Sequence, residues 1–187
     1  GRGIWAPCIR YNKGTFYIFT NVNGAGLQVF RSQSIYGPWE RNQLPGRHDL
    51  SVLFDDDGKV YIISGGGVPY PIEELSPDLR SFVEDAPKHS LPERMGEGHH
   101  LYKINGKYVD VSAIPGGPVD QMVAVADSID GPWKVERMVQ SESLGVTNAA
   151  IAKANANDRG LWIHQGGIVH TPSGEWWCVI MSDHGSA

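Results

Sequence analysis

One pattern recurs four times along the chain: an apolar run, a tight-turn signal with a glycine, and a second alternating run. The clearest copy joins the runs His99–Ile104 and Lys107–Ser112 through Asn105-Gly106. Asn-Gly between two such runs is the strongest short-range hairpin signal, because both central residues of a type I′ turn need positive φ. The glycines that open the second runs are spaced by 44, 48 and 68 residues: Gly14, Gly58, Gly106 and Gly174.

The sequence outside the hairpins repeats as well. Tyr36-Gly-Pro-Trp39 returns as Asp130-Gly-Pro-Trp133, and Phe82 takes the place of the tryptophan between them. Units of about 45 residues with four short strands each are typical of a β-propeller. We therefore expect an all-β fold, a β-propeller domain over 1–187. Its four visible blades are placed at about 1–47, 48–94, 95–145 and 146–187, with a short helical turn or a long loop at 147–157.

The composition argues against several functions. The 187 residues carry a formal net charge of −5 without a basic cluster, which disfavours a nucleic-acid partner. No apolar run reaches the length of a membrane span, so no membrane partner is expected. Cys8 and Cys178 lie far apart within apolar runs, and we expect two buried free thiols. The run Asp55-Asp56-Asp57 is interpreted as a solvated turn and not as a calcium loop.

Candidate site residues stand at the starts of the apolar runs. The innermost strands of a propeller run along its axis, so residues at their starts converge on one end of the channel. These positions hold Trp5, Asp49, Glu97 and His164. Two carboxylates in a concave site are the minimum for glycoside hydrolysis, and an aromatic ring suits the apolar face of a sugar. Trp5 could instead be core, Asp49 could cap a turn, and His164 could bind a backbone carbonyl.

The whole chain resembles glycoside hydrolase family 43. The resemblance rests on four ordered motifs that match the second to fifth blades of the family: Gly3-Ile-Trp-Ala-Pro-Cys-Ile-Arg-Tyr11, His48-Asp-Leu-Ser-Val-Leu-Phe54, Glu97-Gly-His-His-Leu-Tyr102 and His164-Gln-Gly-Gly-Ile-Val169. It implies a five-bladed propeller and an inverting hydrolase.

The resemblance also implies a role for each site residue. Glu97 is the general acid, and Asp49 is the carboxylate that keeps it protonated and oriented. Trp5 lines the sugar pocket. Apart from the resemblance, His99 and His100 both follow the acid and one of them is expected to point inward; His99 is taken as the substrate contact. His164 lies at the bottom of the pocket, near an axial site that often holds calcium and that it would reach through water. No cofactor is required, although a structural calcium ion fits the resemblance.

Two parts of the family pattern fall outside this sequence. The family's general base is an aspartate upstream of Trp5-Ala-Pro, and an arginine follows the position where this sequence stops. We therefore expect a fragment, inactive alone, whose partners are the missing segments of the same propeller. The expected activity removes terminal α-L-arabinofuranosyl or β-D-xylosyl units from plant cell-wall polysaccharide, in a secreted or periplasmic location. A non-catalytic carbohydrate-binding propeller and a protein-interaction propeller are the alternatives.

Overall fold

The computed structural model describes residues 3–65, 67–92, 94–114, 121–139 and 163–182, and its regular structure there consists of strands. The strands are β1 Ile4–Asn12, β2 Thr15–Val22, β3 Gly26–Ser32, β4 Glu40–Leu44, β5 His48–Phe54, β6 Val60–Gly65, β7 Tyr70–Leu75, β8 His89–Leu91, β9 Glu97–Ile104, β10 Lys107–Ala113, β11 Gln121–Ala126, β12 Lys134–Val139, β13 Ile163–His170 and β14 Trp176–Ser182. Within these ranges no helix is long and apolar enough to cross a membrane. The segment 147–157 lies outside the described residues.

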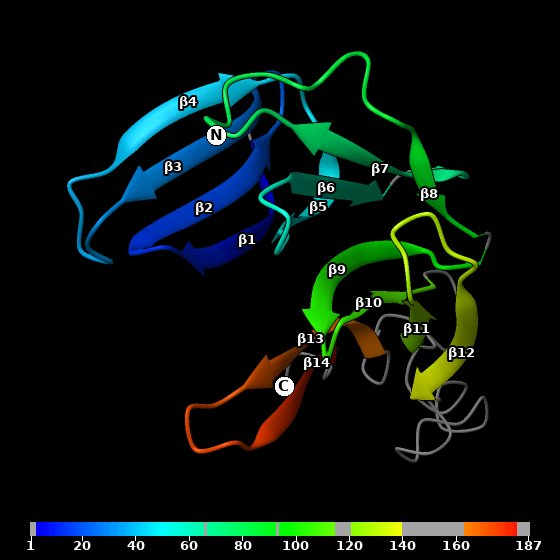
Figure 1. Cartoon of the computed structure of the whole chain (residues 1–187). Helices are drawn as coiled ribbons and strands as arrows, with labels where there is room; N and C mark the ends of the chain where they lie inside the picture. The colour runs from blue at the N-terminus through cyan, green and yellow to red at the C-terminus, as the bar shows by residue number, and fades with distance from the viewer. Residues whose placement is uncertain (1–2, 66, 93, 115–120, 140–162, 183–187) are drawn as a thin grey trace, which may run out of the picture.

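The strands form four antiparallel sheets that follow one another in chain order. Three are up-and-down meanders, β1-β2-β3-β4, β5-β6-β7-β8 and β9-β10-β11-β12, and the fourth is the hairpin β13-β14. The first strand of each sheet contacts the first strand of the next, so β1, β5, β9 and β13 lie innermost (Figure 1). The expectation of an all-β propeller is therefore confirmed.

The hairpin that the sequence marks most clearly is present. Lys107 pairs with Ile104, and the residues between them, Asn105 and Gly106, have φ of 51° and 77°. Both values lie in the left-handed region that a type I′ turn requires. This turn fixes the register of β9 against β10, and therefore the face on which each side chain of β9 lies.

Each innermost strand carries one extra residue near its start. On β1, Trp5 pairs with Asn21 and Cys8 with Phe19, so three steps along β1 match two steps along β2. The same shift recurs in the other three hairpins, over residues 48–51, 97–100 and 163–166. Such a β-bulge bends the strand and re-aims the side chains beside it. The four bulges stand at equivalent places, so they mark one end of the propeller axis.

The hydrophobic core lies between the sheets. Phe19, Leu27 and Val52 belong to a cluster that joins the first sheet to the second. Ile63, Leu101 and Met122 belong to a cluster that joins the second sheet to the third. Burial between neighbouring sheets, and not within any one of them, therefore supplies the hydrophobic stabilisation.

Polar contacts near the axis join the innermost strands directly. Arg10 of β1 donates from Nη2 to Ser51 Oγ of β5 at 2.8 Å and from Nε to the Val52 carbonyl at 2.6 Å. Ser51 Oγ also accepts the Leu101 N–H of β9 at 3.0 Å. One hydroxyl group thus connects three sheets.

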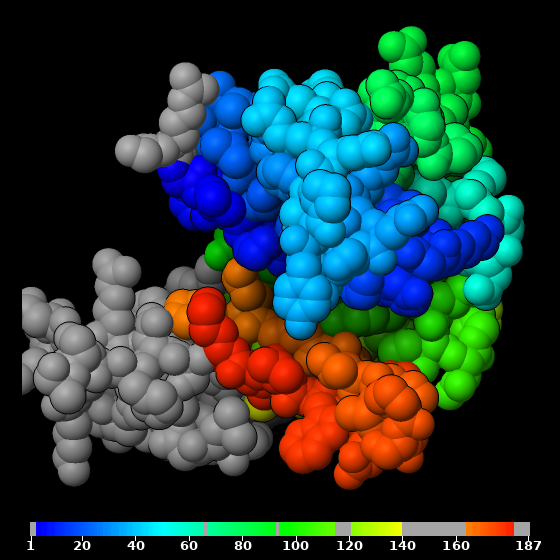
Figure 2. Space-filling model, turned by 90° about the vertical axis from the view of Figure 1, so that its left-hand side faces the viewer, coloured from blue at the N-terminus to red at the C-terminus, as the bar shows by residue number. Residues whose placement is uncertain are grey.

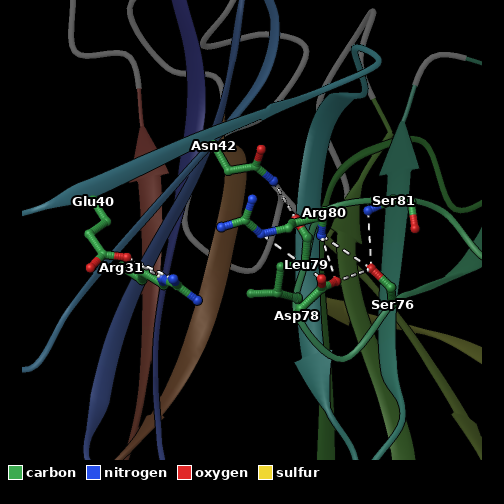
Figure 3. Close-up of polar contacts among 8 residues, drawn as sticks. All are labelled: Arg31, Glu40, Asn42, Ser76, Asp78, Leu79, Arg80 and Ser81. Carbon is green, nitrogen blue, oxygen red and sulfur yellow. Dashed lines mark hydrogen bonds and ion pairs between the residues drawn. The ribbon is translucent and has the colours of Figure 1, made fainter.

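The outer edges of the first two sheets are joined as well (Figure 3). Asn42 Nδ2 on β4 donates to the Leu79 carbonyl at 2.6 Å. Leu79 belongs to a tight turn in which Ser76 Oγ accepts the N–H groups of Arg80 and Ser81, at 3.1 and 3.0 Å. The side chain of Leu79 is 3% exposed and lies in the core between the two sheets. The turn therefore provides both an apolar anchor and a hydrogen-bond acceptor.

Asp55 contradicts the interpretation of its turn as solvated, because it is only 7% exposed. Its carboxylate accepts hydrogen bonds from Lys103 Nζ and Tyr108 OH of the third sheet, both at 2.5 Å. Burial would raise the pKa of Asp55, but the hydrogen bonds from Lys103, Tyr108 and the Asp56 N–H, together with the charge of Lys103, lower the pKa below its usual value. Burial, followed by the hydrogen bond to Asp55, raises the pKa of Tyr108 to about 12.

The first and last sheets each leave apolar side chains in solvent. In Figure 2 the dark-blue atoms of the first sheet and the orange-red hairpin stand on either side of a notch. Cys178 of β14 is also exposed, so the expectation of a buried thiol holds for Cys8 and is wrong for Cys178. The exposed large apolar residues of these two sheets include Ile4, Ile9, Tyr11, Val169, Trp177, Val179 and Met181.

Replacing Asp55 tests the contact between the second and third sheets. Asp55→Asn should lower the free energy of unfolding at pH 7 by about 2–4 kcal/mol, because Lys103 loses its partly buried counter-charge. Since the pKa of Asp55 is lowered in the folded state, its contribution is complete above the unfolded value near pH 4 and disappears as the pH falls through the folded value. Urea unfolding from pH 7 to pH 2.5 should therefore show the two proteins converge in acid. Asp57→Asn, in the same turn but exposed, is the control and should change little; equal losses in both variants would contradict the assignment.

Candidate active site

The starts of β1, β5 and β9 form one cluster that contains an aromatic ring, an imidazole and two carboxylates. The rings of Trp5 and His48 meet edge to face, with centroids 5.1 Å apart. His48 Nε2 lies 3.4 Å from Asp49 Oδ2. Polar atoms of His48, Asp49 and Glu97 all lie within 4.8 Å of one another. Three of the predicted site residues, Trp5, Asp49 and Glu97, are thus brought together, with His48 in addition.

Asp49 is placed by the bulge of β5. Its φ is 44°, in the left-handed region that Asp tolerates better than most residues with a Cβ. The residue is 7% exposed, so its carboxylate is enclosed by protein. A Cβ added to Gly65, on the neighbouring strand β6, would lie 3.5 Å from the Asp49 Cβ and 3.3 Å from Glu97. The absence of a side chain at position 65 therefore keeps the space in which the two carboxylates meet.

Glu97 is fixed by the backbone on both sides. A Cβ on Gly96 would lie 2.0 Å from the Ala113 carbonyl oxygen, and one on Gly98 would lie 2.4 Å from the Gln165 Cβ. The N–H of Gly96 donates to Tyr70 OH at 3.0 Å. Ser112 Oγ donates to the Met95 carbonyl at 2.5 Å. The two glycines thus serve close packing around the acid, in addition to their positive φ of 87° and 65°.

Trp5 is held at its edge and leaves part of its ring in solvent. Its indole Nε1 donates to Asn23 Oδ1 at 2.6 Å, and its carbonyl accepts from Thr20 Oγ1 at 2.7 Å. The residue is 42% exposed. Trp5 is therefore a fixed ring at the edge of the cluster, not a core residue.

His99 does not lie where the sequence placed it. It is 1% exposed, with Nδ1 2.8 Å from Asp110 Oδ2 and its ring 5.0 Å from that of Tyr70. Burial raises the pKa of Asp110, and the adjacent imidazole opposes this rise. An enclosed imidazole has no surface for a sugar, so the substrate contact expected for His99 does not fit the structure. His99 instead packs inside the protein next to the segment that carries Glu97.

His100 lies near the propeller axis. Its ring stacks on that of Tyr102 with centroids 6.2 Å apart. Burial, then the positive charges of Arg10 and His99, lowers the pKa of His100 to about 4. This imidazole is therefore neutral at physiological pH.

His164 belongs to the start of β13. Its carbonyl accepts a hydrogen bond from Gln121 Nε2 of β11 at 3.0 Å, and its side chain is half-buried. The next residue, Gln165, fills the space where a Cβ of Gly98 would lie. The fourth sheet is thus packed against the segment that carries Glu97, with His164 beside that contact.

His48 is the site residue that sequence reasoning missed. His48, Trp5 and Glu97 occupy equivalent positions, because each is the last paired residue before the bulge of its strand. Their partners on the neighbouring strands are Gly65, Asn21 and Ala113, respectively. Asp49 is equivalent to Gly98 instead. The extra residue in each inner strand hides this equivalence when the apolar runs of the sequence are aligned with one another. The neighbouring pair His48-Asp49 at the start of an inner strand was the available signal.

Comparisons with known proteins point to one family. The family described as Glycosyl hydrolases family 43 matches residues 1–185. A xylosidase/arabinosidase of Butyrivibrio fibrisolvens is 34% identical over 68% of the chain, which spans 28% of that protein. A non-reducing-end α-L-arabinofuranosidase of Bacteroides ovatus is 30% identical over 96% of the chain, which spans 34% of that protein. The chain thus covers about a third of the length of these relatives.

Solved structures show the same fold. A bifunctional protein of Bacteroides eggerthii that combines GH43 and CE parts superposes with a TM-score of 0.77 at 32% identity, covering 96% of this chain and 23% of that one. A xylan β-1,4-xylosidase of Bacillus halodurans superposes with a TM-score of 0.75 at 25% identity, covering 98% and 38%.

Gly98 offers a test of the packing around Glu97. Gly98→Ala should lower the free energy of unfolding by about 2–4 kcal/mol, because the new methyl group adds a clash with Gln165 to the strain of positive φ. Gly106→Ala is the matched control, since its φ is also positive and nothing lies within 4 Å of the added Cβ. It should cost about 1 kcal/mol from backbone strain alone. Chemical denaturation of both variants gives the comparison, and equal losses would show that Gln165 does not confine this segment.

Proposed function

Because the chain belongs to glycosyl hydrolase family 43, we propose that it carries the acid side of an inverting hydrolase acting on terminal pentose units. The linkages are α-L-arabinofuranosyl or β-D-xylosyl, in plant cell-wall polysaccharide. The observation that supports this most is the close approach of the Asp49 and Glu97 carboxylates beside an exposed tryptophan, with polar atoms within 4.8 Å. Glu97 would protonate the departing glycosidic oxygen while water attacks the opposite face of the sugar.

The spacing of the carboxylates supports the division of roles. In an inverting enzyme the acid and the base stand about 6.5–9.5 Å apart, so that a water molecule fits between substrate and base. Asp49 and Glu97 are closer than this, and the Asp49 side chain is only 8% exposed. Asp49 is therefore poorly placed to activate water. Its place beside Glu97 instead suits it to orient the acid toward the glycosidic oxygen.

The general base is proposed to come from a further sheet of the propeller. The other two inner strands carry no carboxylate at the equivalent positions: β1 has Trp5 and Ala6 there, and β13 has Ile163 and His164. The apolar side chains exposed on the first and last sheets provide surfaces on which such a sheet could pack. The greater length of the relatives is consistent with this.

The proposed proton transfer needs no cofactor, because Glu97 itself supplies the proton. A structural calcium ion near His164 would require oxygen ligands. The described residues beside His164 offer Gln121 Oε1, which is buried and has no hydrogen-bond partner. Such an ion would be coordinated mainly by water. Since a cell-wall polysaccharide is met outside the cytoplasm, we place the protein in a secreted or periplasmic location.

The two carboxylates should respond differently to substitution. The test uses a propeller completed with the segments that flank this region in the longer relatives. Glu97→Ala should reduce cleavage of a natural oligosaccharide by about 10²–10⁴ in rate and spare a dinitrophenyl pentoside, whose leaving group departs without a proton. Asp49→Asn should also slow the natural oligosaccharide more than the dinitrophenyl pentoside, but by a smaller factor, because Asp49 is proposed to act through Glu97.

Two controls accompany this experiment. Glu175→Ala, in an exposed turn, should leave both rates unchanged. The isolated chain sets the baseline without a general base and should show no meaningful turnover. An equal loss on both substrates in Glu97→Ala would show that Glu97 is not the acid.

The exposed apolar faces should make the isolated chain associate. Contiguous apolar surface in solvent drives contact between molecules. Sedimentation velocity should therefore detect dimers or larger species, and charged substitutions at Ile9 and Val179 together should shift the population toward monomer. A stable, cooperative monomer of the unmodified chain would contradict this prediction.

A further inference from the structure

His48 occupies a position between the aromatic ring and the acid. Its ring stands edge to face with Trp5 at 5.1 Å, and one of its nitrogens lies within 4.8 Å of carboxylate oxygens of both Asp49 and Glu97. Its register equivalents on the neighbouring inner strands are Trp5 and Glu97 themselves. All three residues therefore lie at the same level along the propeller axis.

The fold makes little use of this imidazole. Among the described residues its ring contact is the edge of Trp5, and its ion-pair contact is the 3.4 Å approach to Asp49. Its side chain is 38% exposed, whereas His99, two residues beyond Glu97, is sealed against Asp110. A partly exposed imidazole beside a catalytic pair is available for a ligand.

The chemistry of imidazole matches a sugar hydroxyl. A neutral ring offers one donor and one acceptor, and a hydroxyl group can satisfy either of them. A pentose lying against the exposed part of Trp5, with its glycosidic oxygen at Glu97, would bring a hydroxyl of the same ring toward His48. Trp5 then provides apolar contact, Glu97 acts on the glycosidic bond, and His48 sets how the sugar is rotated between them.

We propose that His48 is a substrate-positioning residue that hydrogen-bonds a hydroxyl of the terminal pentose. The inference rests on the proposed function and extends it to a residue that binds the sugar and not the leaving group. A contact to the sugar ring is shared by every pentoside, whatever its leaving group. Its loss should therefore affect all pentosides alike, unlike the loss of Glu97.

The test compares His48→Phe with His48→Gln in the completed propeller. Phenylalanine keeps a flat ring against Trp5 without polar nitrogens, and kcat/KM should fall about 10–100-fold, the effect of one strong hydrogen bond. The fall should be equal for a dinitrophenyl pentoside and a natural oligosaccharide. His48→Gln, which restores a donor and an acceptor, should recover part of it. A pentoside that lacks the bonded hydroxyl should be cleaved equally by wild type and His48→Phe, because the interaction is then already absent.

His170→Phe is the matched control. This histidine also stacks on a tryptophan, Trp176, with centroids 4.4 Å apart, but at the other end of an inner strand. Its kcat/KM should not change. An unchanged kcat/KM in His48→Phe, or a fall confined to the poor leaving group, would overturn the inference.

A binding measurement separates this inference from the proposed function. If the completed wild type cleaved no pentoside, the proposed function would fail. In the same samples, dissociation constants for free xylose and arabinose, followed by tryptophan fluorescence, would still report on His48. Weaker binding (a higher Kd) in His48→Phe that is partly restored in His48→Gln supports the contact. Equal Kd values in all three proteins refute it.

Discussion

The extra residue at the start of each innermost strand is the constraint on which the site depends. Without it, the side chains of Asp49 and Glu97 would lie on whichever face of the sheet the strict alternation along the strand gives them. With it, two residues of the inner strand oppose one on the neighbouring strand, and the strand bends at the end where the sheets converge. Asp49 accepts positive φ at the bulge, and Gly98 does so at the equivalent place on β9. The cluster of Trp5, His48, Asp49 and Glu97 thus forms at small irregularities in otherwise regular hairpins.

This constraint also explains what the sequence could and could not predict. Turn chemistry is local, so Asn105-Gly106 identified its hairpin and the repeat of such hairpins identified the propeller. A bulge has no comparable signature, because one inserted residue leaves an apolar run looking intact. His99 was therefore assigned to the pocket although it faces the second sheet, and His48 was overlooked. Asp55 was misjudged for a different reason: its partners, Lys103 and Tyr108, are about fifty residues away in the chain.

The two ends of the axis differ in how their charges are used. At one end Asp49 and Glu97 face each other across a space kept open by Gly65, and no Lys or Arg joins them among the ion pairs of the described residues. At the other end Asp55 is satisfied by a cation and a phenol. The carboxylates of the first end are therefore available for chemistry, whereas the carboxylate of the second end joins two sheets. The carboxylates that serve stability and those that serve chemistry thus lie at opposite ends of the same sheets.

The shared hydroxyl of Ser51 has a consequence for how the protein comes apart. Repeat proteins whose units touch only their neighbours can lose a terminal unit and leave the others folded. Here Ser51 accepts from Arg10 in the first sheet and from Leu101 in the third, while Tyr102 accepts the Ile168 N–H of the fourth. Detaching the first sheet would leave Ser51 Oγ and the Val52 carbonyl of the second without the Arg10 donor, and the Tyr102 ring of the third without the Arg10 charge that lies over it. Separation of the first sheet therefore costs hydrogen bonds near the axis. This cost couples the sheets into a single cooperative unit despite their modular order along the chain.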